Sequence, residues 1–98
     1  MSLPVRLLPE ARAEFAAAAD WYDRQRPGLG VDFVARVRNV LDRIAADPQR
    51  HAAVHGDVRK VAVPRFPYIV LYHEEYGEII IISVFHTARD PSVWKSRA

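Results

Sequence analysis

The chain of 98 residues contains no cysteine, so it can form neither a disulfide nor a cysteine-ligated zinc site. It also has no long uncharged apolar run. A secretory signal segment and a membrane-spanning helix both need such a run. We therefore expect a cytoplasmic protein with no membrane partner.

A strong excess of charge is missing as well, since 14 Lys and Arg stand against 12 Asp and Glu and the formal net charge is +2. Residues 1–57 hold eight basic and eight acidic side chains, whereas residues 58–98 hold six and four. All the excess positive charge therefore lies in the C-terminal part. This excess of positive charge permits contact with a polyanion or an acidic peptide, but it is smaller than the excess expected of a dedicated nucleic-acid binder.

What the sequence does contain is typical of a folded domain. Half of the residues are hydrophobic and 27% are charged, a balance that can offset the ordering entropy of the chain. The length is too short for two hydrophobic cores of ordinary size, so residues 1–98 are expected to form a single domain.

The N-terminal half predicts a strand followed by two helices. Residues 5–8 form a short apolar run, and Pro9 is well placed to begin a helix that extends to about Gln25. The segment 26–30, Arg-Pro-Gly-Leu-Gly, should reverse the chain into an antiparallel helical hairpin. A second helix is expected from about Val31 to Asp47, and its apolar face consists of Phe33, Val37, Val40, Leu41 and Ile44.

The C-terminal half predicts a loop and then three strands. Residues 49–57 show no periodicity, whereas 58–63, 68–73 and 78–85 are rich in β-branched and aromatic residues. The polar, glycine-containing segment 74–78 should join the last two strands as an antiparallel hairpin. Pro91 then allows a helical turn through Trp94.

These elements predict an α+β fold of two layers, β-α-α-β-β-β, with the helical hairpin on one face of a mainly antiparallel sheet. Residues 69–71 and 79–82 place aliphatic side chains on both faces of that sheet. We therefore expect the second face to be covered, either by the C-terminal turn with Trp94, by a second copy, or by a partner chain.

Two groups of basic residues could meet if the first and last of the three strands are neighbours. The first group is Arg59, Lys60 and Arg65, and the second is His86, Arg89, Lys95 and Arg97. Arginine clamps phosphates or carboxylates with two hydrogen bonds, so a joint cluster would bind an anion. The alternative is that these residues are solvated surface charges.

The segment His86-Thr87-Ala88-Arg89-Asp90-Pro91 is the richest in chemistry. A histidine acid or base and an arginine that stabilises a phosphorane would suffice for RNA cleavage without a metal. A structural interpretation is equally open: His86 ends a strand, Arg89 pairs with a carboxylate, and Asp90 starts a helix. The other histidines lack the spacing of a metal motif, so no metal or cofactor is expected.

Four segments together resemble the RelE/ParE toxin superfamily, whose members are often called plasmid stabilisation proteins. They are Ala19-Asp20-Trp21-Tyr22, Arg26-Pro27-Gly28-Leu29-Gly30, Arg65-Phe66-Pro67-Tyr68 and His86-Thr87-Ala88-Arg89-Asp90-Pro91-Ser92-Val93-Trp94. The resemblance implies the toxin of a type II toxin–antitoxin pair, neutralised by a cognate antitoxin that alone contacts operator DNA. It also implies one of two targets: messenger RNA on the ribosome for RelE-like members, or DNA gyrase for ParE-like members.

The residues that the resemblance assigns to RelE-like nucleases are largely missing. Lys60 matches the first of two basic strand positions, but the second falls on Ala62 and an expected arginine falls on Ile69. Trp94 stands near an expected tyrosine. Losing a guanidinium at the reacting phosphate removes several kcal/mol of transition-state stabilisation. A nuclease would therefore need a rearranged site, for which the candidates are Arg59, Lys60, Arg65, His86 and Arg89.

The hairpin turn and the closing Arg-Asp-Pro are more similar to ParE-like toxins, which implies a gyrase binder that is not an enzyme. A third possibility is a degenerate module that only binds antitoxin. For contact with target or antitoxin, the candidates are Arg59, Lys60, Arg65, Ile69, Ile80, Arg89 and Trp94.

Overall fold

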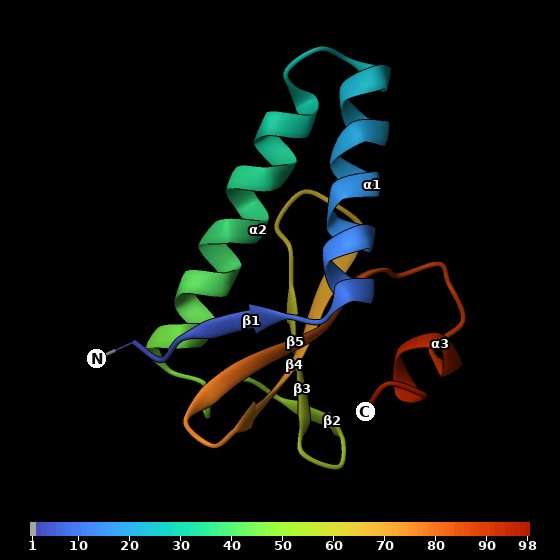
Figure 1. Ribbon diagram of the computed structural model, residues 1–98. Helices are drawn as coiled ribbons and strands as arrows, with labels where there is room; N and C mark the ends of the chain where they lie inside the picture. The colour runs from blue at the N-terminus through green and yellow to red at the C-terminus, as the bar shows by residue number, and fades with distance from the viewer. Residues whose placement is uncertain (1) are drawn as a thin grey trace.

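A computed structural model describes residues 2–98, with three helices and five strands in the order β-α-α-β-β-β-β-α (Figure 1). The elements are β1 (Val5–Leu7), α1 (Pro9–Gln25), α2 (Leu29–Ala46), β2 (Ala53–His55), β3 (Val58–Ala62), β4 (Tyr68–Glu75), β5 (Glu78–His86) and α3 (Ser92–Lys95). The sheet order is β1-β5-β4-β3-β2, in which β1 is parallel to β5 and all other pairs are antiparallel. The predicted α+β class is confirmed.

The structure differs from the sequence prediction at two element boundaries. The segment expected to be a loop contains β2, an edge strand whose three residues are all exposed and which pairs irregularly with β3. Such a strand has no buried face, so it leaves no hydrophobic periodicity in the sequence. The second helix begins at Leu29 rather than near Val31, directly after Gly28, whose φ of 90° lies in the left-handed region.

The tip of the helical hairpin is fixed by a carboxylate and a glycine. Asp23 Oδ1 accepts hydrogen bonds from the backbone N–H groups of Gly28 and Gly30, at 3.0 and 3.2 Å. At Gly30 the two helices lie so close that a Cβ atom would sit 2.5 Å from the backbone oxygen of Ala19. The tip therefore tolerates no side chain at this position.

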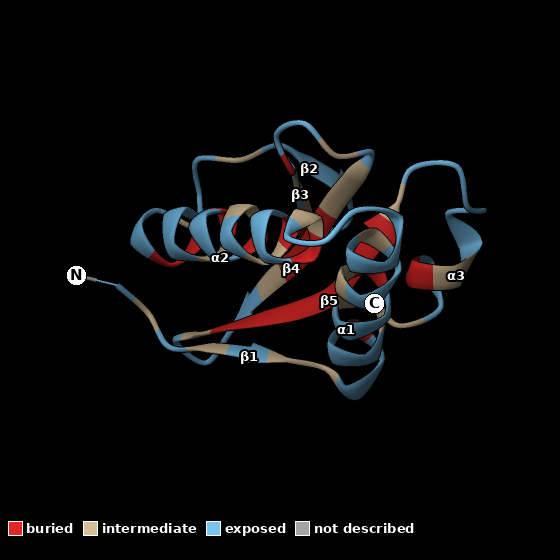
Figure 2. Ribbon diagram, turned by 90° about the horizontal axis from the view of Figure 1, so that it is seen from above, coloured by how far each residue is buried: buried red, intermediate tan, exposed pale blue. Residues whose placement is uncertain are grey.

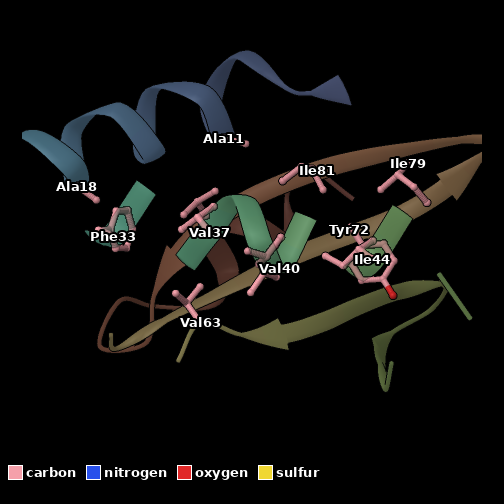
Figure 3. Packing of buried hydrophobic residues seen from close by; sticks show 12 residues of the cluster. Ala11, Ala18, Phe33, Val37, Val40, Ile44, Val63, Tyr72, Ile79 and Ile81 are labelled. Atoms are coloured by element: carbon pink, nitrogen blue, oxygen red, sulfur yellow. The ribbon is translucent and has the colours of Figure 1, made fainter. Parts of the chain in front are cut away.

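The main core lies between the helical hairpin and one face of the sheet (Figure 3). The helices contribute residues of the predicted apolar face of α2. The sheet contributes residues of β3, β4 and β5 and of the turn after β3. Its buried members are Ala11, Ala18, Phe33, Val37, Val40, Ile44, Val63, Val70, Tyr72, Ile79, Ile81 and Val84.

A second, smaller core lies on the other face, between the sheet and α3. Trp94, 5% exposed, packs there with Val58, Leu71, Ile82 and Phe85. Of the three covers expected for this face, the structure contains the C-terminal turn. Strand β5 is buried from Ile79 to Phe85, as Figure 2 shows in red.

Consecutive isoleucines reach both cores because successive residues of a strand point to opposite faces, and a bulge lies among them. Leu71 is paired with Ser83 and Tyr72 with Ile81, so Ile82 is an extra residue on β5. Ile81 then faces the helices, whereas Ile82 faces α3. Within residues 2–98, no helix has the length and apolar character needed to cross a membrane.

Candidate functional site

The two predicted groups of basic residues do not form one cluster, because β4 separates β3 from β5. Within the first group, the side chains also diverge. Arg59 lies opposite Tyr72 of the main core, and Lys60 lies opposite Leu71 of the second core. Cross-strand partners share a face, so Arg59 and Lys60 point to opposite faces of the sheet.

Arg59 holds the loop that follows α2. Its guanidinium donates to the backbone oxygens of Gln49 and His51 and to Gln49 Oε1. Burial, followed by the nearby cations Arg43 and Arg50, lowers the pKa of His51. Arg59 therefore stabilises a loop and is not free to hold a phosphate.

The positions that would carry the charge of a RelE-like nuclease form an apolar row across the sheet. Ala62 is paired with Ile69, and Ile69 is paired with Phe85 on the next strand. Ile69 also packs against the second core, which contains Trp94. On this face a phosphate would meet aliphatic and aromatic groups in place of guanidinium groups.

Around Glu14, on α1, the structure brings together three polar side chains that the sequence did not connect to it. Glu14 Oε1 accepts from Ser83 Oγ at 2.8 Å, and Oε2 accepts from Arg89 Nη1 at 2.9 Å. Arg97 donates to both carboxylate oxygens and also to the backbone oxygen of Ile82. Arg89, predicted as a candidate, is thus paired with a carboxylate, as in the structural interpretation of its segment.

A signal for this cluster was present in the sequence. Glu14 lies three residues after buried Ala11 and four before buried Ala18, so it shares their side of the helix. A carboxylate at such a position needs a cationic or hydrogen-bonding partner. The sequence did not show which residue is this partner, because Arg97 lies 83 residues from Glu14 along the chain.

His86, at the end of β5, has its Nδ1 occupied, since that atom accepts from the backbone N–H of Ala88 at 3.0 Å. Its ring packs edge-on against Tyr68, with centroids 5.1 Å apart. Burial raises the pKa of the Tyr68 hydroxyl, which keeps it neutral. Asp90 accepts a hydrogen bond from the backbone N–H of Ser92, and this bond lowers the pKa of its carboxyl.

These groups border an open groove of about 680 Å³ beside α1. Its lining is mainly apolar and includes Trp21, which is 51% exposed. The residues lining the groove are Glu14, Ala17, Ala18, Trp21, Tyr22, Pro67, Tyr68, Val84, His86 and Arg89. Two of its polar groups are already engaged: Glu14 accepts four hydrogen bonds and His86 Nδ1 accepts one. It is therefore better suited to binding than to proton transfer.

The remaining candidates are dispersed. Arg65 is exposed on the β3–β4 turn, with a φ of 69°. Ile80 is 3% exposed and Trp94 is 5% exposed, so both are covered by the chain itself. Their roles in partner contact remain predictions.

Comparison with known proteins identifies the family. A family model described as "ParE toxin of type II toxin-antitoxin system, parDE" matches residues 5–91. A solved chain of the "Chromosomal ParDE TA system from P. aeruginosa" superposes with a TM-score of 0.76 at 17% identity, covering 87% of this chain and 96% of that one. No curated protein matches in sequence. Because the family model spans most of its length, the chain belongs to the ParE toxin family of type II toxin–antitoxin systems.

Proposed function

We propose that this toxin acts by binding DNA gyrase, without catalysis of its own, and that a cognate antitoxin neutralises it. The observation that carries the proposal is that Ala62 and Ile69, which stand where a RelE-like nuclease would carry charge, lie in one apolar row with Phe85. The binding of antitoxin is supported by the family and by the neighbour from a ParDE system.

The electrostatics around Glu14 also support a binder. Glu14 pairs with both Arg89 and Arg97, so the guanidinium of Arg89 is already held by a carboxylate before any substrate arrives, and the three groups share one net positive charge. A ribonuclease of this kind needs uncompensated cations at the phosphorane. The first candidate group is no better placed, since Arg59 is engaged by the loop after α2.

The test compares both activities in one induced culture. Induction should arrest growth with an SOS-type DNA-damage response, and the purified chain should inhibit supercoiling of relaxed plasmid by purified gyrase. Primer extension on cellular mRNA should reveal no new cut sites. Arrest with mRNA cleavage that is abolished by His86→Ala would overturn the proposal in favour of a nuclease.

A gene for a small DNA-binding antitoxin immediately upstream would support the paired system. Co-expression of that antitoxin should restore growth and yield a stable complex. A folded chain that binds the antitoxin but never arrests growth would instead indicate a degenerate module.

A further inference from the structure

The turn between β3 and β4 places an arginine where glycine is favoured. Phe66 N–H donates to the backbone oxygen of Val63 at 3.4 Å, which closes a four-residue turn. Pro64 occupies its second position, and Arg65, with φ of 69°, occupies its third. This arrangement corresponds to a type II turn, in which the third residue has a left-handed backbone that is unfavourable for any residue with a Cβ. Such a conformation costs energy and persists only where the surrounding structure holds it.

The turn is held rigidly against both long helices. The ring of Phe66 packs edge-on against Tyr22 of α1, with centroids 4.9 Å apart, and against Phe33 of α2, at 5.1 Å. In Figure 1 the turn lies beside the helical hairpin. Arg65, next to this anchor, is exposed at a fixed place on the surface.

Three arginines from three different elements line one hollow of about 290 Å³ at this place. Arg26 follows α1, Arg36 lies on α2, and Arg65 lies on the turn; Tyr22 and Phe66 are also in its lining. Within residues 2–98, none of these three arginines forms a salt bridge. Their charge is therefore available, unlike that of Arg89 and Arg97.

We propose that this arginine pocket, made of Arg26, Arg36, Arg65, Tyr22 and Phe66, binds a carboxylate on an apolar segment of a partner protein. Guanidinium groups clamp a carboxylate, and the neighbouring rings accept an aliphatic side chain. The inference rests on the proposed function only in taking the partner to be a protein.

Size and charge both favour a protein segment over a nucleic acid. The hollow is at the lower limit of sites for drug-sized ligands, which span about 300–1,000 Å³, so it suits a side chain rather than a nucleotide. Asp32 also lines it and reduces its net positive charge, so the hollow can balance a single carboxylate better than a chain of phosphates. A net charge of +2 for the whole protein gives little general attraction for a polyanion.

The test is an NMR titration of the ¹⁵N-labelled full chain with the blocked peptide N-acetyl-Leu-Glu-Leu-Glu-Leu-amide. The peptide should shift the resonances of Arg36, Arg65 and Phe66, and its glutamine counterpart should bind about ten-fold more weakly. An oligothymidylate serves as the nucleic-acid probe. Absence of peptide binding, equal binding of the glutamine peptide, or tighter binding of the oligonucleotide would each overturn the proposal.

Variants separate binding from folding. Arg65→Gly removes the guanidinium and relaxes the turn, so peptide affinity should fall about ten-fold while the melting temperature stays equal or rises. Arg50→Gln removes an exposed charge outside the pocket and should leave affinity unchanged. Tyr76→Gly makes the same kind of glycine substitution at the other left-handed residue and should also leave affinity unchanged. Asp32→Asn should tighten binding.

Unchanged affinity in Arg65→Gly, or an equal loss in Tyr76→Gly, would contradict the assignment. Gyrase takes no part in the titration. If the chain fails to inhibit gyrase in the supercoiling assay, the proposed pocket is therefore unaffected. If the peptide fails to bind in the titration, the proposed target is unaffected.

Discussion

The guanidinium of Arg97 donates to both carboxylate oxygens of Glu14, at 2.9 Å to Oε1 and 3.2 Å to Oε2. The two side chains are only 14% and 13% exposed, and they join the end of the chain to α1. Trp94 lies just before this contact and fills the second core. The pair therefore fixes the segment that covers one face of the sheet.

Glu14→Gln should lower the free energy of unfolding by about 2 to 3 kcal/mol, because it leaves the largely buried Arg97 without a counter-charge; the half-exposed Arg89 contributes less. Urea denaturation measures this loss. Glu10→Gln, an exposed carboxylate on the same helix, is the matched control and should change stability by less than about 0.5 kcal/mol. Equal effects of the two substitutions would show that the Glu14 pairs contribute nothing specific.

Trp94→Ala should destabilise the chain by about 3 kcal/mol, because it empties much of the second core. Binding of a hydrophobic dye should increase as Leu71 and Phe85 become accessible. Lys95→Ala, at the neighbouring exposed residue, is the control and should change the stability little. If Trp94→Ala melts like the parent protein, the C-terminal turn does not cover this face in solution.

Ile80→Asp should cost several kcal/mol of stability, because the site is 3% exposed and would bury an unpaired carboxylate. Ile69→Asp should cost less, since Ile69 is only half-buried. Thermal unfolding of both variants, alone and with antitoxin, measures these effects. Two variants that melt and bind antitoxin like the parent would contradict the buried placement of both residues.

Stability should fall as the pH is lowered through the ordinary pKa of histidine, 6.5, because of His51. Its pKa is lowered in the folded state by burial and by nearby arginines, so the unfolded state takes up the proton first. The stability that the neutral His51 side chain provides is present above pH 6.5. It is lost between pH 6.5 and the lower pKa of His51 in the folded state. Urea midpoints from about pH 7.5 to about pH 5.5 measure the slope.

The matched variant for this pH dependence is His51→Gln, in which the slope should flatten. His55→Gln, at an exposed histidine of β2, is the control variant. A parent protein whose stability is constant over this range would contradict the burial of His51.

Sequence periodicity was sufficient for the large elements and their packing faces. On the predicted apolar face of α2, Phe33, Val37, Val40 and Ile44 are buried and Leu41 is partly buried, because a helical face leaves water where apolar residues recur every three or four positions. The turn between β4 and β5 was predicted equally well from local residues. Strand β2 was not, because it is held only by backbone pairing with β3.

The sequence by itself determined the α+β class, the helical hairpin, and the resemblance to ParE toxins that the family match confirms. These depend on local patterns, which are read within a few turns of chain. Only the tertiary structure decided which charges meet. It separated Arg59 from Arg89, paired Arg97 with Glu14, and brought Arg65 beside Arg26, because contacts between distant residues depend on the order of strands in the sheet.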